Sequence, residues 1–440
     1  MNRLDALKAP LRVLANRREL AYSALADGTM VLPAAAIQYQ SRDGERPYHP
    51  DRELFYLTGA TEPGSVAVLS GSDSTFILFV RDKDPEAELW SGPRLGPELA
   101  ADRFHPDECY PLSELGERLP SLLQRADRLY WRLGRGGEVE SHITAALAHT
   151  HLKGSRTGSG PRGVVDPGEV LDKLRMTKDA HELDLIKCAV NMTIEGHKVG
   201  AGKIAPGVGE WEIEAAINAV FRSAGGSGPG YGTIVGSGVN ACVLHYVGND
   251  DVIAEDSLVL VDAGAEYGLY NADITRTYPS GGKFTQPQRD IYELVDTARS
   301  AAIDSIVPGA LIAEGHDTAT RILVDGLVGL GVLEGDPAEL ISEGAHKLFY
   351  PHQTSHWLGL DVHDPGDYAQ DGKSQTLEPG MVVTVEPGLY FRPGQPKTPD
   401  AFAGIGVRIE DDVVVTVEGR EVLTASLPTE SSDVERLIEA

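Results

Sequence analysis

Two aspartates in the sequence occupy positions that could hold a metal ion. Asp262 ends the apolar run of residues 258–262, and Asp273 follows after a turn-rich stretch. Because side chains alternate between the two faces of a strand, the two carboxylates can lie side by side on antiparallel neighbours and share a cation. The alternative for either residue alone is a solvated hairpin end, where aspartate is common.

A second apolar stretch repeats this arrangement with glutamates. Glu386 ends the run of residues 381–386, whose side chains should be buried on both faces, so its charge needs a partner. Glu410 follows in the segment GIGVRIEDDVVVT, two residues after Arg408. A plain salt bridge between Arg408 and Glu410 is the alternative here. The matching positions in the two stretches favour four carboxylates that converge on one site.

Histidines cluster near the second pair of acids. The segment HQTSHWLGLDVHD places His352, His356 and His363 within twelve residues, although the whole chain has only 13 histidines. His245, in the segment VLHY, is a fourth candidate. A single histidine is more often a hydrogen-bonded core or surface residue than a ligand, whereas three close together indicate a shaped site.

The chemistry that these residue types support is metal-assisted hydrolysis. One histidine with four carboxylates is an oxygen-rich ligand set that suits Mn²⁺, with Zn²⁺ or Co²⁺ as alternatives. Two ions about 3.5 to 4 Å apart can share carboxylates and activate a water molecule as a nucleophile. Other chemistries lack their motifs: the sequence has no GxSxG elbow and no GxxxxGK[ST] phosphate loop, and the glycines of residues 226–232 lack the context of a dinucleotide fingerprint.

The elements that must position these residues form a faint internal repeat. In each copy a Pro-Gly pair precedes a helix, predicted at residues 211–224 and from Pro308 to about residue 330. A strand that ends in a carboxylate then follows, as does a second extended segment with another carboxylate. A duplication of this kind would place two half-domains around one sheet.

The part of the chain before the repeat is predicted to contain a separate domain. Residues 1–150 mix helical stretches with short apolar runs such as 65–70 and 75–80, which indicates an α/β domain. Residues 151–167 are rich in Gly, Ser and Pro and are the predicted linker. A long helix is predicted at residues 169–199.

The acidic composition of the chain disfavours several kinds of partner. The chain of 440 residues has 39 basic and 66 acidic residues, a net charge of 39 − 66 = −27, which disfavours binding to nucleic acids or anionic membranes. No membrane span or signal peptide is visible. Cys109, Cys188 and Cys242 lie far apart and form no CxxC, so we expect core thiols and a cytoplasmic location.

Several motifs together resemble a known enzyme family. They are HYVGND, VLVDAGAEYGLYNADITRTY, HQTSHWLGLDVHD, LEPGMVVTVEPGLY and GIGVRIEDDVVVT, with ELFYLTGATEPGSVAVL nearer the N-terminus. They are similar to the bacterial aminopeptidase P (Xaa-Pro aminopeptidase) group of pita-bread dinuclear metallopeptidases. The resemblance implies an α/β (α+β) chain. It would have a smaller creatinase/prolidase-like N-terminal domain at residues 1–172 and a pita-bread catalytic domain with an internal pseudo-twofold duplication at residues 173–440.

The resemblance also implies roles for individual residues. The acid at Asp262 would hold one metal, Asp273 and Glu410 would bridge both, and His356 and Glu386 would complete the shell of the second. A hydroxide that bridges the metals would attack the carbonyl of the Xaa-Pro bond, with Glu386 as proton acceptor and donor. His363 and His245 match histidines that bind substrate or stabilise the oxyanion. His352 matches an outer-site histidine, and Arg408 matches an arginine that orients carboxylates. Tyr390 and Tyr231 match two tyrosines near the site.

The chain also departs from the pattern of this family. Gln353-Thr354 stands where a known relative has Gly-Leu, so the loop before His356 can be shaped differently and substrate preference can change. Trp90 matches a tryptophan that relatives lend to the site of a neighbouring subunit. A core or interface tryptophan is the alternative for Trp90.

The resulting hypothesis is a cytoplasmic peptidase, working as a homodimer or homotetramer, that removes the first residue from peptides with proline in second place. A prolidase restricted to dipeptides is the nearest alternative. It needs a cation for the substrate carboxylate, and residues 366–376 contain Lys373 but no arginine. A metal-free peptide-binding module and a creatinase are disfavoured by the five ligand types. A methionine aminopeptidase is disfavoured by the large N-terminal domain.

Overall fold

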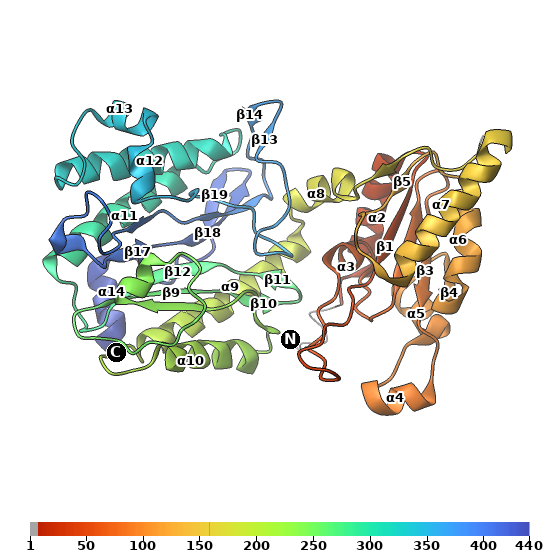
Figure 1. The fold of residues 1–440 in the computed structure, drawn as a ribbon, viewed down its shortest axis with the longest axis horizontal. Helices are drawn as coiled ribbons and strands as arrows, with labels where there is room; N and C mark the ends of the chain where they lie inside the picture. Colours follow the sequence, from red (N-terminus) through yellow and green to blue (C-terminus); the bar gives the residue numbers. More distant parts are fainter. Residues whose placement is uncertain (1–7, 158, 440) are drawn as a thin grey trace. The chain divides into compact units, whose positions relative to one another are not determined.

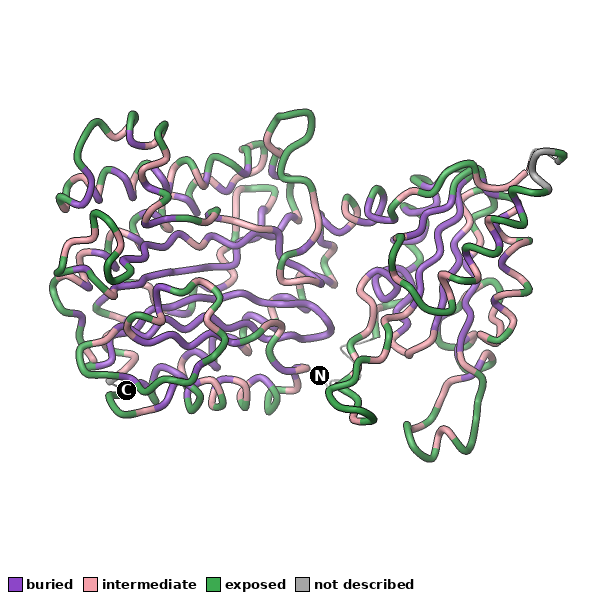
Figure 2. Tube along the Cα trace, in the orientation of Figure 1, coloured by how far each residue is buried: buried purple, intermediate pink, exposed green. Residues whose placement is uncertain are grey.

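The computed structural model describes residues 8–157 and 159–439. These residues divide into two compact units, residues 8–174 and 175–439. Figure 2 shows that within each unit the strands are largely buried while the outward faces of the helices are exposed. Among the described helices, none has the length and apolar character needed to cross a bilayer.

The N-terminal unit is built on a mixed six-stranded sheet with the order β4-β3-β2-β1-β5-β6 (Figure 1). β1, β2 and β3 are antiparallel neighbours, and the outer strands join in parallel. The strands predicted at residues 65–70 and 75–80 are confirmed as β2 and β3. The bounds are β1 Thr29–Pro33, β2 Val66–Ser70, β3 Thr75–Val80, β4 Glu108–Pro111, β5 Leu129–Tyr130 and β6 Val164–Val165.

Helices cover this sheet and bury its apolar side chains. Leu115, Leu119 and Leu123 recur at helical spacing on α6 and pack with Ile143 of α7 against the strands. Trp90 is 85 % exposed on α4, so the alternative of a core tryptophan was wrong. The helices are α2 Leu11–Leu25, α3 Arg52–Thr58, α4 Pro85–Ser91, α5 Gly96–Phe104, α6 Leu115–Leu123, α7 Gly137–Thr157 and α8 Gly168–Met176, with a 3₁₀ turn at Leu112–Glu114.

The predicted linker at residues 151–167 was wrong. α7 continues to Thr157, and β6 within this stretch joins the sheet beside β5, with Val164 opposite Leu129. Backbone hydrogen bonds from Leu129 to Gly163 and from Trp131 to Val165 hold it there. Two residues of β6 are enough to extend a sheet edge, but they give almost no periodic signal in a Gly-rich sequence.

The single long helix predicted at residues 169–199 is instead two helices, α8 and α9 (Ala180–Ala201). Thr177 between them forms a β-bridge with Met381. Asp179 then caps α9: its carboxylate accepts from the Glu182 N–H, and the Glu182 carboxylate accepts from the Asp179 N–H, both at 3.0 Å. This capping box starts a new helix where apolar periodicity alone suggests continuity.

The C-terminal unit consists of two similar halves. The first has α9 and α10 (Glu210–Ser223) with the antiparallel sheet β8-β9-β12, and the second has α11 and α12 with the antiparallel sheet β15-β18-β19. Figure 1 shows the sheets between α9 and α10 on one side and α11 and α12 on the other. The predicted duplication and its helices are therefore present.

Short strands, helices and 3₁₀ turns complete this unit around the two sheets. The strands are β7 Gly228–Pro229, β8 Ile234–Ser237, β9 Leu258–Ala263, β10 Ala265–Tyr267, β11 Tyr270–Asn271, β12 Ile274–Pro279, β13 Ala369–Gln370, β14 Lys373–Ser374, β15 Val382–Val385, β16 Gly388–Tyr390, β17 Gly406–Arg408, β18 Asp411–Thr416 and β19 Gly419–Val422. The helices are α11 Gln286–Ser305, α12 Ile312–Gly329, α13 Pro337–Ser342 and α14 Ser431–Glu439, with 3₁₀ turns at Gly238–Cys242, Ala345–Leu348 and Asp400–Phe402.

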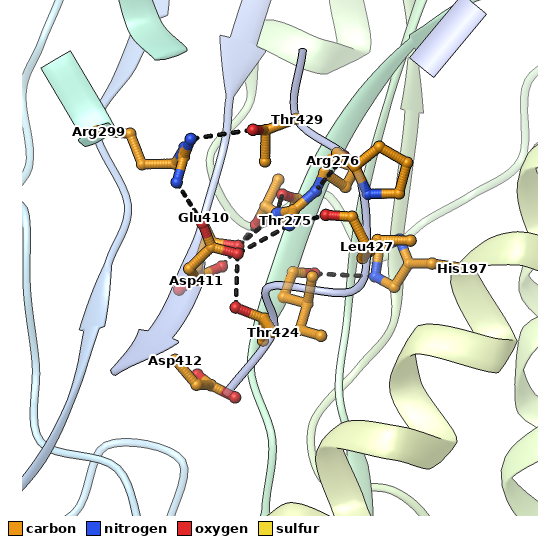
Figure 3. Close-up of polar contacts among 12 residues, drawn as sticks. His197, Thr275, Arg276, Arg299, Glu410, Asp411, Asp412, Thr424, Leu427 and Thr429 are labelled. Atoms are coloured by element: carbon orange, nitrogen blue, oxygen red, sulfur yellow. Dashed lines mark hydrogen bonds and ion pairs between the residues drawn. The ribbon is translucent and has the colours of Figure 1, made fainter. Parts of the chain in front are cut away.

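A buried arginine joins a strand of one half to a strand of the other (Figure 3). Arg276 on β12 donates to the Asp411 carboxylate at 2.7 Å and to the backbone oxygens of Glu410 and Leu427 at 2.6 and 3.0 Å. Arg299 of α11 donates to the other Asp411 oxygen at 2.6 Å. Because Arg276 and Asp411 are buried and the Arg299 side chain is only 11 % exposed, each charge depends on the others for compensation.

Replacing this arginine should destabilise the fold strongly. Arg276→Met removes the donors to Asp411 and to the backbone oxygens of Glu410 and Leu427, so the free energy of unfolding should fall by about 3 to 5 kcal/mol. Urea unfolding followed by circular dichroism measures the change. The control is Arg420→Met, whose ion pair with Asp304 is exposed (27 % and 70 % for the two side chains), and which should cost less than about 1 kcal/mol. Equal losses in the two variants would contradict the role of the Arg276 network.

Candidate metal centre

The four predicted carboxylates lie where strands of the two halves meet. Asp262 on β9 stands opposite Thr275 on β12, and Asp273 is two residues before Thr275, so both acids project from the same face. Glu410 lies between β17 and β18, and its N–H bonds to the Thr275 oxygen at 3.0 Å. Glu386 directly follows β15.

His356 reaches the acids from a loop beside β15. Its N–H donates to the Thr384 hydroxyl at 3.1 Å, and its carbonyl accepts from the Thr384 N–H at 3.0 Å. One ligand atom each of Asp273, His356 and Glu410 lie within 4.8 Å of one another. Asp262 and Glu386 line the same cavity, which has a volume of about 440 Å³. The structure thus brings the five predicted ligands together.

The hydrogen bonds of His356 fix which nitrogen can bind a cation. Nδ1 lies 3.0 Å from the carbonyl oxygen of Trp357, which can only accept, so Nδ1 carries a hydrogen. Nε2 then faces the site, 3.4 Å from Asp273 Oδ2 and 3.5 Å from Glu386 Oε1. A backbone carbonyl that orients the imidazole in this way is typical of metal-binding histidines.

Buried negative charge dominates the electrostatics of the cavity. Burial raises the pKa of Glu386 to about 7, and the negative charges of Asp273 and Asp262 contribute to this increase. Burial and then Asp273 and Glu386 raise the pKa of Glu410 well above its usual range. Burial opposes charge on His356, but its contacts with Asp273 and Glu386 outweigh burial and raise its pKa to about 9. A site that holds protons this firmly suits divalent cations, which would take the place of those protons.

Arg408 and Tyr231 hold the carboxylates in place. Arg408 donates from Nη2 to Asp262 Oδ2 at 2.5 Å and from Nε to the Thr275 hydroxyl at 3.1 Å. Its ion pair is therefore with Asp262, and the predicted alternative of a salt bridge to Glu410 was wrong. The Tyr231 hydroxyl lies 2.6 Å from Asp262 Oδ1 and 2.5 Å from Asp273 Oδ1, and its one proton is shared between them.

Three further histidines stand around the metal ligands. His352 donates from Nδ1 to the Gln353 oxygen at 2.8 Å, and its Nε2 lies 2.9 Å from the Tyr390 hydroxyl. Burial and the nearby Arg408 lower the pKa of His352 to about 3, so it is neutral. His363 makes an edge contact with the His356 ring, with centroids 4.4 Å apart. The cavity is also lined by His245.

Tyr390 is the one predicted site residue that does not line the cavity. Tyr390 lies behind the residues that line the cavity, where its hydroxyl accepts a hydrogen bond from Arg408 Nη1 at 3.0 Å and contacts His352. It thereby connects the arginine that orients Asp262 with the outer histidine.

Thr275, Thr384 and Asp412 contact the ligands and were not identified from the sequence. The Thr275 hydroxyl donates to Glu410 Oε2 at 2.6 Å (Figure 3), and Asp412 accepts from the Asp273 N–H at 3.1 Å. Burial, followed by the charge of Asp273, raises the pKa of Asp412 well above its usual range. The signals were present, because Thr275 follows Asp273 by two residues and Asp412 belongs to the run of three acids that Glu410 begins.

Comparison with known families identifies the type of protein. The family model "Metallopeptidase family M24" matches residues 184–417, more than half of the chain, and "Aminopeptidase P, N-terminal domain" matches residues 14–130. The chain belongs to metallopeptidase family M24. The resemblance inferred from the motifs is confirmed. So is the fold class: an α/β chain with an aminopeptidase P N-terminal domain and an M24 pita-bread domain.

Several relatives are similar to this chain over almost its whole length. The Xaa-Pro aminopeptidase of Escherichia coli K12 is 41 % identical over 429 residues, which cover 96 % of this chain and 97 % of that protein. The Haemophilus influenzae Xaa-Pro aminopeptidase is 38 % identical and covers 98 % of both chains. The structure of Pseudomonas aeruginosa aminopeptidase PepP superposes with a TM-score of 0.94 at 39 % identity, over 98 % of this chain and 99 % of that one.

A further M24 structure bears on the metal. Zn-substituted E. coli aminopeptidase P in complex with product superposes with a TM-score of 0.93 at 40 % identity, covering 98 % and 99 % of the two chains. Membership of a metallopeptidase family and the buried carboxylate–imidazole set both indicate divalent metal ions at this centre.

Loading the centre with a divalent ion should release protons. Near pH 7 His356 carries a proton and Glu386 is partly protonated, given pKa values of about 9 and about 7, and both must lose their protons to bind a cation. Calorimetric titration with Mn²⁺ or Zn²⁺ in buffers of different ionisation enthalpy counts the protons released. Because protons compete with the ion, affinity should fall as pH is lowered from about 7.5 to about 6. An affinity independent of pH over this range would contradict the charge balance.

Proposed function

We propose that the chain is a metal-dependent aminopeptidase that hydrolyses the bond between the first residue of a peptide and a proline in second place. The observation that carries the proposal is the convergence of four carboxylates, three of them buried, and His356 Nε2 on one cavity. Xaa-Pro aminopeptidases of two bacteria, each covering almost the whole chain, support it. Proline demands a dedicated enzyme because its amide nitrogen carries no hydrogen and its ring restricts the backbone.

The five predicted ligands would hold two ions. Asp262, Asp273, Glu410, His356 and Glu386 would together hold these ions, because all five line one cavity. The oxygen-rich set favours Mn²⁺, with Zn²⁺ or Co²⁺ as alternatives. When bound, the ions supply Lewis-acid activation of water and of the scissile carbonyl.

The surrounding side chains move the proton and stabilise charge. Glu386, whose pKa of about 7 suits a general base, accepts the proton of the attacking water and delivers it to the proline nitrogen. His245 and His363 line the cavity and donate hydrogen bonds to the carbonyl oxygen as it gains negative charge. Burial and then the neighbouring His356 lower the pKa of His363, so it donates as a neutral imidazole.

The remaining predicted residues position the catalytic groups. Arg408 and Tyr231 hold Asp262 through both carboxylate oxygens, at 2.5 and 2.6 Å. Tyr390 links Arg408 to His352, which stands at the outer wall of the cavity and meets the substrate.

The proposal extends to the organisation of the protein. Residues 1–172 form an auxiliary domain and residues 173–440 the catalytic domain, in line with the division of the described chain after Leu174.

Trp90 and Leu89 are 85 % and 80 % exposed, which supports a homodimer or homotetramer in which Trp90 meets a second copy. The protein is cytoplasmic, in keeping with its three free cysteines. One of them, Cys188, is exposed and was wrongly expected in the core.

Peptide length separates this function from that of a prolidase. With Mn²⁺, Zn²⁺ or Co²⁺ restored to the apoprotein, an Xaa-Pro-Yaa tripeptide should be cleaved faster than the Xaa-Pro dipeptide. The reason is that Lys373, the one basic side chain in residues 366–376, is exposed on β14, and a single exposed lysine holds a carboxylate weakly. Liquid chromatography of the released residue gives both rates. Cleavage of the dipeptide alone would identify a prolidase, and no cleavage with any metal would favour a peptide-binding module.

Glu386→Gln tests the proton transfer. The amide keeps the size of the side chain but cannot take up a proton, so kcat should fall by about 10² to 10⁴-fold in the metal-loaded enzyme. Steady-state kinetics with metal analysis of the same samples distinguishes lost chemistry from lost metal. Glu343→Gln, an exposed acid in the same unit, is the matched control and should keep full activity. Full metal-dependent activity of Glu386→Gln would sink the assignment.

A further inference from the structure

A second cavity, of about 460 Å³, adjoins the metal cavity. α12 contributes Ile312, Ala313 and His316, and the segment around β13 and β14 contributes Tyr368 and Ser374. The two cavities share four lining residues, so a peptide bound at the metal ligands can continue from one into the other: Gln353, Ser355, His356 and His363.

His316 owes its position to a residue in which the chain departs from its family. Its Nδ1 lies 3.0 Å from the hydroxyl of the fully buried Thr354, which also bonds to the Tyr350 hydroxyl. Tyr350 and Thr320 also contact the His316 ring, each at 3.5 Å. Thr354 therefore makes the shortest of the contacts that hold His316 in this cavity wall.

The second cavity offers hydrogen-bond donors that the fold leaves uncommitted. The Tyr368 oxygen accepts the Trp357 N–H at 3.0 Å, and the Ser374 oxygen accepts the Ala313 N–H at 3.2 Å, so both hydroxyl protons are free to point elsewhere. The Ser355 hydroxyl is buried and finds no partner among the described residues. These donors lie beside the apolar Ile312 and Ala313, a combination typical of sites that select a side chain by shape and by one polar group.

The direction of the peptide follows from the apolar side chains of the metal cavity. Ile234, Leu244 and Val247 line that cavity and are absent from the lining of the second one, which suits them to the first residue of the substrate. A peptide whose scissile bond lies at the metal ligands then extends past His356 and His363 toward α12.

We infer that the second cavity receives the side chain of the residue that follows proline and that it selects an apolar stem ending in a carbonyl, as in glutamine. The inference rests on the proposed function and names its substrate class. A glutamine carbonyl can accept from the free hydroxyls, whereas methionine, of similar length, would bury them unpaired. A site built to hydrogen-bond a substrate discriminates strongly against an analogue without that group. We expect a preference of about tenfold.

Kinetics with three tripeptides test the inference. The wild-type enzyme should cleave Ala-Pro-Gln with a kcat/KM about tenfold above that for Ala-Pro-Met. Ala313→Phe fills the cavity from an exposed position in the first turn of α12, so it should abolish this ratio and bring the rates for Ala-Pro-Gln and Ala-Pro-Met to that of Ala-Pro-Gly, which has no side chain to place there. Asp325→Phe, an exposed change on the same helix away from the cavity, is the matched control and should keep the ratio.

Two kinetic outcomes would overturn the inference: equal rates for Ala-Pro-Gln and Ala-Pro-Met in the wild type, or a ratio that survives Ala313→Phe. Thr354→Val provides a second variant, since it removes the hydroxyl that holds His316 without changing the size of the side chain. It should reduce the preference for glutamine.

Binding of the product dipeptides separates the inference from the proposed function. Calorimetry should show that Pro-Gln binds the wild type more tightly than Pro-Met, and that Ala313→Phe removes the difference. If no tripeptide is hydrolysed but this difference is present, the proposed function fails and the selectivity of the cavity stands. If hydrolysis occurs without any difference in rate or binding, the inference fails and the function stands.

Discussion

The catalytic unit depends on one electrostatic constraint, the concentration of carboxylates in a buried cavity. Asp262, Asp273 and Glu410 are buried and line one cavity together with Glu386. Arg408 is the one permanently charged cation among the described residues that line this cavity. Burial and then the neighbouring negative charges raise the pKa values of Asp262, Glu386 and Glu410, so the site either holds protons or binds cations. Divalent ions would neutralise the repulsion among the carboxylates and would supply the Lewis acid that hydrolysis needs.

The fold supports this arrangement by building it twice. Each half of the unit ends a buried strand in one acid and presents a second acid on a following extended segment, so the two halves need only face each other to complete the site. Arg276 and Asp411 secure that approach from behind, because a buried pair tolerates little displacement before its charges lose compensation. The duplication therefore supplies the acids of the metal centre, two from each half of the unit.

The proposed selection of substrate, in contrast, depends on residues outside the metal centre. Four of the predicted ligands lie in strands or next to them, and His356 lies on a loop beside β15, while the walls of the adjoining cavity come from α12 and from the segment around β13 and β14. Loop residues can change without disturbing the strands. The Thr354–His316 contact illustrates this, because it alters a cavity wall while the neighbouring His356 keeps its hydrogen bonds to Thr384 and Trp357.

The sequence by itself determined the chemistry of the site and the elements that carry it. Ligand types and strand alternation are local properties, and they were enough to select Asp262, Asp273, Glu386 and Glu410 and to find the duplicated helices and strands. The resemblance of the motifs to a known family then selected His356 from four candidate histidines. Tertiary structure alone decided that Arg408 pairs with Asp262, that β6 completes the N-terminal sheet and that Thr354 holds His316. Each of these depends on contacts between residues 30 or more positions apart, which no local pattern encodes.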